Sequence, residues 1–128
     1  MKKLTAIILA ALLLTGCGAA AQAGGSNYEQ ITMEQAQDLM GSQEGYVILD
    51  VRTPEEYASG HIPGAVNIPN EVIGTDPISE LPQMDQLILV YCRSGNRSKQ
   101  ASQKLADLGY TNVKEFGGIR DWPGEVVS

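Results

Sequence analysis

The sequence predicts an α/β domain built on a mainly parallel β-sheet. Two continuous apolar runs, residues 46–51 and 87–91, are too short for helices and suit strands that are buried on both faces. Segments with helix-capping residues alternate with these runs along the chain. In sheets of this kind, functional sites form beyond the carboxyl ends of the strands.

The first helix is predicted to start after Thr32, which forms a capping-box pattern with Gln35. An apolar stripe follows the cap, and Gly41 is a plausible stop. The run 46–51 is then the first strand. It is apolar throughout apart from one acid, as expected when helices cover both faces of a sheet.

The second helix is predicted after Thr53, with Pro54 at its first position and Glu56 three residues beyond the cap. Gly60 ends it. Residues 65–68 form a short strand that is bounded by Pro-Gly on one side and by Pro on the other.

The second apolar run places Cys92 at the carboxyl end of a buried strand. A polar loop, residues 93–97, leads to a helix over 98–108 with one apolar face, which Gly109 ends. Residues 113–116 give the last predicted strand. The rule for parallel sheets therefore places chemistry at Cys92.

Composition sets limits on function. The 128 residues are 43% hydrophobic with a formal net charge of −6, which suits one globular domain. We expect no nucleic-acid partner, because phosphate binding needs clustered cations. Two cysteines exclude a disulfide-stapled miniprotein.

The amino terminus has the features of a signal peptide. Lys2 and Lys3 precede an apolar run, residues 4–14, which is too short to span a bilayer. The following Leu-Thr-Gly-Cys17 resembles a bacterial lipobox, although an ordinary cleavage region is the alternative. We therefore expect a lipoprotein signal peptide over 1–16 and a lipidated Cys17 at the head of a flexible tether, 17–27.

This resemblance implies a location outside the cytoplasm, anchored to a bacterial membrane by lipid. In a Gram-negative cell that is the periplasmic side. Gly18 after the lipidated cysteine would favour the outer membrane there.

The loop after Cys92 has a composition suited to anion binding. Small residues let its backbone N–H groups curl inward, and the start of the next helix adds a positive field. Such a site favours the thiolate of Cys92, while Arg93 and Arg97 suit an oxyanion such as a sulfonate. The alternative is an inert core thiol at the end of a strand.

Four blocks resemble the signatures of rhodanese-type sulfurtransferases, in the expected order. They are Asp50-Val-Arg-Thr-Pro-Glu-Glu-Tyr57, Gly60-His-Ile-Pro-Gly-Ala-Val-Asn-Ile-Pro69, Cys92-Arg-Ser-Gly-Asn-Arg-Ser98 and Gly117-Gly-Ile-Arg-Asp-Trp122. The resemblance implies a single rhodanese-like domain over 28–128. Its fold would be a five-stranded parallel sheet flanked by helices on both sides.

By that resemblance, Cys92 attacks the outer sulfur of thiosulfate or a similar small anionic donor and becomes a persulfide. An external thiol or cyanide then takes the sulfur. No metal or other cofactor is implied. The donor and the persulfide would be bound by the loop residues Arg93, Ser94, Gly95, Asn96, Arg97 and Ser98.

Four other residues are expected to support the site structurally. Asp50 and Arg52 suit a buried ion pair that braces the loop. His61 suits a loop contact more than a general base, and Trp122 suits core packing. Glu55 and Glu56 are interpreted as a solvated face.

Two alternative functions remain. A phosphatase or arsenate reductase of the related type needs arginine six positions after the cysteine, where this chain has Ser98. The other is a lipid-anchored module that presents a persulfide or binds an anion without turnover.

Overall fold

The computed structural model describes residues 27–128, which contain a five-stranded, fully parallel sheet in the order β1-β5-β4-β2-β3. The predicted fold class is therefore confirmed. The strands are β1 (Glu29–Gln30), β2 (Val47–Asp50), β3 (Val66–Asn67), β4 (Ile88–Cys92) and β5 (Val113–Gly118).

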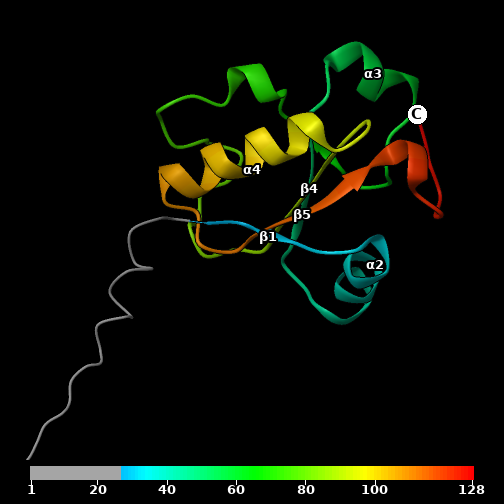
Figure 1. The fold of residues 1–128 in the computed structure, drawn as a ribbon, viewed down its shortest axis with the longest axis horizontal. Helices are drawn as coiled ribbons and strands as arrows, with labels where there is room; N and C mark the ends of the chain where they lie inside the picture. Colours follow the sequence, from blue (N-terminus) through cyan, green and yellow to red (C-terminus); the bar gives the residue numbers. More distant parts are fainter. Residues whose placement is uncertain (1–26) are drawn as a thin grey trace, which may run out of the picture.

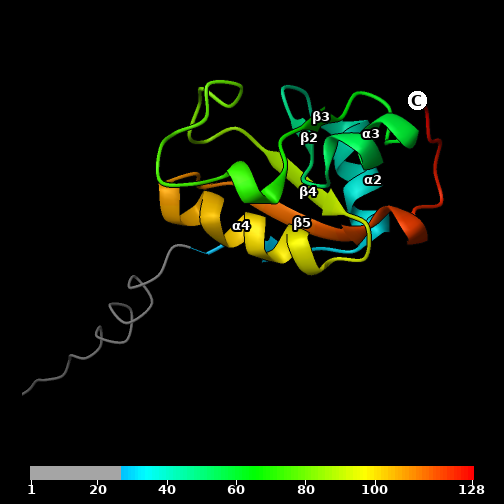
Figure 2. The same ribbon diagram turned by 90° about the horizontal axis from the view of Figure 1, so that it is seen from above.

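Helices cover both faces of this sheet (Figures 1 and 2). Helix α4 (Asn96–Leu108) packs on one face through Ala101 and Leu105, and α2 (Met33–Ser42) packs on the other through Ala36. Three shorter elements complete the described part: α3 (Pro54–Ser59) and the 3-10 helices η2 (Asn70–Val72) and η3 (Ile119–Asp121).

Strand β4 lies in the middle of the sheet, and all five of its residues are buried. Leu89 and Tyr91 belong to the core cluster on the α2 side, while Val90 and Cys92 belong to the cluster on the α4 side. This alternation explains the continuous apolar run, because each face needs its own apolar residues. It also directs Cys92 toward α4.

Both predicted capping boxes are present. The Thr32 hydroxyl accepts the N–H of Gln35, and Thr53 pairs with Glu56 in the same way. The prediction that Gly41 ends the first helix is wrong. Helix α2 continues to Ser42, whose hydroxyl donates to the carbonyl of Asp38 one turn earlier.

Helix α4 begins at Asn96, two residues earlier than the sequence predicts. Gly95 precedes it with φ of 107°, a left-handed conformation that glycine adopts at little cost. The turn at Gly95 therefore shortens the loop to residues 93–95. Arg97 and Ser98 lie in the first turn of the helix instead of in the loop or at its end.

The strands also differ from the prediction, by one residue at the ends of β2, β3 and β4 and by more elsewhere. The edge strand β1 was not predicted, and β5 extends two residues further, to Gly118. No helix within residues 27–128 is long and apolar enough to cross a bilayer. The predicted signal peptide and lipidated Cys17 lie outside the described residues.

Candidate active site

The sulfur of Cys92 lies at the carboxyl end of β4, under the turn that leads into α4. The residue is 1% exposed, and the N–H of Gly95 donates to Sγ at 3.0 Å. The Ser98 hydroxyl lies 3.5 Å from the same sulfur. A backbone amide, a hydroxyl and the start of a helix therefore converge on one thiol.

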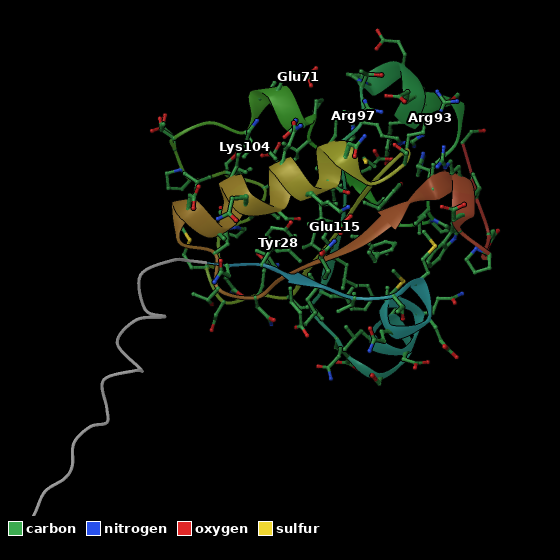
Figure 3. The ribbon with its side chains drawn as sticks, viewed as in Figure 1. Tyr28, Glu71, Arg93, Arg97, Lys104 and Glu115 are labelled. Atoms are coloured by element: carbon green, nitrogen blue, oxygen red, sulfur yellow. The ribbon has the colours of Figure 1, made fainter. Side chains whose placement is uncertain are left out.

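Ser98 connects this thiol to a buried acid on the next strand. Its hydroxyl donates to Oε2 of Glu115 at 2.5 Å, and the carbonyl of Gly95 lies 2.9 Å away. Glu115 also accepts the N–H of Gly117 at 2.9 Å and the side-chain amide of Gln30 at 3.3 Å. Glu115 is 2% exposed and lies on β5 beneath α4 (Figure 3).

The end of β5 approaches the loop closely. A Cβ atom on Gly118 would lie 2.0 Å from the carbonyl oxygen of Arg93, so no side chain fits there. The N–H of Arg120 donates to that same oxygen at 3.3 Å. The closing Gly117-Gly118 motif therefore positions the cysteine loop directly.

Arg97 forms a bidentate pair with Glu56 of α3, at 2.7 Å and 3.1 Å. The hydrogen bond from Arg97 is the main cause that lowers the pKa of Glu56 to about 2, and the capping contacts with Thr53 add to it. Glu56 in turn raises the pKa of Arg97. The interpretation of Glu56 as part of a solvated face is wrong, because this carboxylate joins α3 to the start of α4.

The remaining loop residues lie open to solvent. Arg93, Ser94 and Asn96 are exposed, and the Arg93 side chain forms no hydrogen bond or ion pair within residues 27–128. Figure 3 shows Arg93 and Arg97 at the amino-terminal end of α4, where the helix follows the loop. Of the two loop arginines, Arg93 is thus the one without a carboxylate partner.

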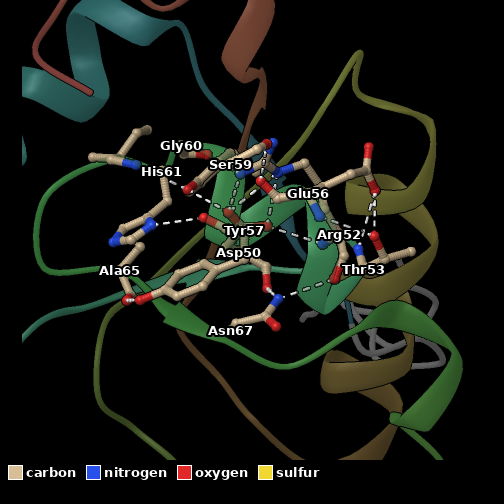
Figure 4. A network of polar contacts seen from close by, with 12 residues as sticks. Asp50, Arg52, Thr53, Glu56, Tyr57, Ser59, Gly60, His61, Ala65 and Asn67 are labelled. Atoms are coloured by element: carbon tan, nitrogen blue, oxygen red, sulfur yellow. Dashed lines mark hydrogen bonds and ion pairs between the residues drawn. The ribbon is translucent and has the colours of Figure 1, made fainter. Parts of the chain in front are cut away.

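A second polar network surrounds Asp50 at the end of β2 (Figure 4). Its carboxylate pairs with the buried guanidinium of Arg52 at 2.7 Å and accepts the Tyr91 hydroxyl at 2.6 Å. Burial and the hydrogen bond to Asp50 raise the pKa of Tyr91. Arg52 also donates to the carbonyl of Gly60 at 2.6 Å.

The predicted buried ion pair is thus present, and its contacts show which backbone segments it positions. Tyr91 belongs to the core cluster on the α2 side, opposite the face that Cys92 joins. Asn67 donates to the carbonyls of both Asp50 and Arg52 at 3.0 Å. The network therefore fixes the chain where it leaves β2 and at the end of α3, the helix that carries Glu56. The prediction that this pair braces the cysteine loop is wrong, because none of these hydrogen bonds reaches residues 93–98.

His61 and Trp122 make their side-chain contacts outside the cysteine loop. The His61 ring stacks on Tyr57 with centroids 3.8 Å apart, and its Nδ1 lies 2.8 Å from the Tyr57 carbonyl. Trp122 packs against Phe116 in the α2-side cluster, with ring centroids 5.7 Å apart. Within residues 27–128, neither side chain forms a hydrogen bond or ring contact with the cysteine loop.

Fold and site together define a single α/β domain with a buried cysteine at the carboxyl end of its central strand, and the comparisons with known proteins agree on the fold. The family model described as Rhodanese-like domain matches residues 32–125. The chain belongs to this family.

Similar proteins include named enzymes. The chain is 38% identical over 73 residues to thiosulfate sulfurtransferase PspE of Escherichia coli K12, covering 57% of this chain and 70% of that protein. It is also 38% identical over 107 residues to thiosulfate sulfurtransferase GlpE of Pseudomonas entomophila, covering 80% and 94%. A solved rhodanese with anions from E. coli has a TM-score of 0.60 and 35% identity, covering 65% of this chain and 98% of that chain.

Two residues of the site were missed by sequence reasoning. Glu115 stands at an alternating position within a strand, which could have indicated that it faces the same side as Val113. Glu56 was recognised as a capping residue, but its second contact spans 41 positions and left no local signal.

Proposed function

We propose that this protein is a sulfurtransferase that moves a sulfane sulfur from thiosulfate or a similar anion to an external thiol or cyanide. The Cys92 thiolate attacks the outer sulfur of the donor, the bond from that sulfur to the sulfonate group breaks, and sulfite leaves. The persulfide on Cys92 is then attacked by the acceptor.

The observation that carries this proposal is the Gly95 N–H at 3.0 Å from Sγ. The first N–H groups of α4 have no acceptor within the helix, and they point toward its amino-terminal end. Negative charge on the Cys92 sulfur, or on a sulfur bound to it, is stabilised by such donors. Named sulfurtransferases among the relatives support the same chemistry.

Arg93 is suited to guide the anionic donor, because its guanidinium is exposed and has no carboxylate partner in the described residues. Arg97 is held by Glu56 and serves first to fix the start of α4. A phosphatase would need an arginine free to bind a tetrahedral oxyanion in a bidentate manner. The pairing of Arg97 therefore favours sulfur transfer over phosphate chemistry.

The acceptor is a separate molecule in this proposal. Cys92 is the free cysteine of the described residues, and the other cysteine of the sequence is Cys17. When Cys17 carries lipid, the chain holds no second thiol that could resolve the persulfide. The loaded protein then waits for an external thiol.

We further propose that the domain works outside the cytoplasm, tethered to a bacterial membrane through Cys17. The support is the order of charged, apolar and Leu-Thr-Gly-Cys segments in residues 1–17. Metabolic labelling with a fatty-acid analogue tests it, with Cys17→Ser as the control that takes up no label. Labelling that is equal in both chains would contradict lipidation.

Intact-protein mass spectrometry of the full chain, before and after thiosulfate, tests the transfer. We expect a gain of one sulfur atom that cyanide or an added thiol removes, and no gain in a Cys92→Ala variant. Absence of the gain in the unaltered chain would contradict the proposal. Uptake that no acceptor discharges would favour a module that presents a persulfide without turnover.

A further inference from the structure

Glu115 is a buried carboxylate without a cation. It is 2% exposed, and none of the four ion pairs within residues 27–128 includes it. An uncompensated buried charge is costly, so its partners decide whether it is tolerated. Those partners are neutral donors on three elements: Ser98 of α4, Gln30 of β1 and the N–H of Gly117.

A continuous hydrogen-bonded path joins this carboxylate to the nucleophile. Oε2 of Glu115 lies 2.5 Å from the Ser98 hydroxyl oxygen, which lies 3.5 Å from Sγ of Cys92. All three residues are buried. The serine has one hydroxyl proton, and three acceptors lie within reach of it: the Glu115 carboxylate, the Gly95 carbonyl at 2.9 Å and the sulfur.

We propose that Glu115 is a positioning residue that receives the Cys92 proton through Ser98 and later returns it. With a thiol and a carboxylate, Ser98 donates to Glu115 and accepts from the S–H group. With a thiolate and a carboxylic acid, Glu115 donates to Ser98, which donates to the sulfur. One proton is thus shared within the site.

The role of this exchange in turnover rests on the sulfurtransferase proposal. During loading, the S–H proton passes to Ser98 as the serine proton passes to Glu115. Cys92 then forms the S–S bond, and sulfite leaves with the electrons of the broken bond. During discharge, an acceptor thiolate takes the outer sulfur, the electrons return to Sγ, and the proton returns from Glu115.

The other charged groups near the sulfur are already engaged or lie apart from the path. On α4, Arg97 pairs with Glu56 of α3, and Cys92 and Glu71 of η2 add to the rise in the pKa of Arg97. Arg93 of the loop is exposed.

On the β1 side, the neutral Gln30 faces Glu115. Glu29 and Lys114 each precede Gln30 and Glu115 by one position on their strands. Their ion pair therefore lies on the opposite face of the sheet. Among the described residues, Glu115 is therefore the carboxylate that is hydrogen-bonded through Ser98 to the sulfur.

The test is the rate at which iodoacetamide alkylates Cys92, measured from acid to alkaline pH on the full chain. The reagent is neutral and reports thiolate directly. We expect two rising steps with a plateau between them, because the two groups lose two protons as a coupled pair. In Glu115→Gln the plateau is lost, and below the single remaining step the rate falls about tenfold per pH unit.

Two variants separate this role from others. Glu44→Gln, which changes an exposed acid, keeps both steps. Ser98→Ala loses the plateau if the path runs through the hydroxyl, whereas an unchanged plateau would overturn the relay. A single step in the unaltered chain would also overturn it, whether or not the variants fold.

Alkylation needs no sulfur donor, so this result is independent of sulfur transfer. If the alkylation rate shows no plateau, the mass-spectrometric test of sulfur uptake by Cys92 is unaffected. Failure of sulfur uptake, in turn, leaves the shared proton standing.

Discussion

Each face of the sheet carries a buried carboxylate near the carboxyl ends of the strands, and the two carboxylates have different kinds of partner. On the α2 side, Asp50 is fully buried and pairs with Arg52, with a further hydrogen bond from Tyr91. On the α4 side, Glu115 has hydroxyl and amide donors but no cation. The first carboxylate has its own counterion, and the second is connected to a nucleophile.

This difference separates structural support from chemistry. Arg52 extends from Asp50 to the Gly60 carbonyl and so ties two chain segments together. A compensated charge of this kind holds its neighbours in one geometry. A carboxylate without a counterion, next to an exchangeable hydroxyl, is suited to gaining and losing a proton.

The largest expected effect is on the α4 side. Cys92→Ser should abolish the formation of thiocyanate from thiosulfate and cyanide, because a hydroxyl does not carry the sulfur as a thiolate does. The fold should persist, since the replacement is small. Cys17→Ser is the matched control and should retain the rate; turnover by the Cys92 variant above the reagent background would refute the covalent mechanism.

On the α2 side, Asp50→Ala should cost about 3–5 kcal/mol of unfolding free energy, because it leaves the buried Arg52 without its partner. Glu115→Gln should cost about 1–2 kcal/mol, the scale of lost hydrogen bonds. Urea titrations measure both. Equal losses in the two variants would break the distinction between the two carboxylates.

A smaller effect is expected between the faces, at the Glu56–Arg97 pair. The pKa of Glu56 is lowered from 4.5 to about 2 in the folded protein, so the unfolded chain binds more protons between these values. The stabilisation is therefore complete above about pH 5 and is lost as the pH falls toward 2.

Arg97→Ala should remove about 1 kcal/mol near neutral pH, since both side chains are partly exposed. The difference from the unaltered chain should shrink on acidification, and a difference that is constant down to low pH would contradict this account. In the transfer assay, weaker donor capture is expected as α4 loses its tether. Unchanged kinetics would show that donor capture does not depend on Arg97.

The smallest effect on sulfur transfer is expected at His61. Replacement by alanine removes the stacking on Tyr57 and should lower stability by about 1 kcal/mol. The rate of sulfur transfer per folded molecule should stay the same, because the ring contacts α3 and not the cysteine loop. A tenfold drop in that rate with stability intact would assign the ring a part in the chemistry.

Local patterns predicted the interior of the fold well. The run 87–91 corresponds to β4, and Thr32 and Thr53 cap helices as expected, because strand burial and helix capping depend on neighbouring residues. Strand β1 escaped prediction because it consists of two exposed polar residues that pair with β5. Its strand conformation comes from the neighbouring strand and not from its own sequence.

The candidate site was predicted only in part, for a similar reason. Cys92 and the loop could be recognised within one continuous segment. The start of α4 at Asn96 depends on the turn at Gly95, and Glu115 reaches Ser98 only after the sheet has formed. Contacts between distant strands and helices leave no periodic pattern that a single sequence reveals.

The close approach at Gly118 has a consequence for engineering. Its backbone is extended, with φ of −126°, so lack of space, and not an unusual conformation, requires glycine there. A graft of residues 92–98 into another parallel sheet would therefore need a matching notch in the adjacent strand. The transferable unit is the loop together with β5, two segments that helix α4 separates in the sequence.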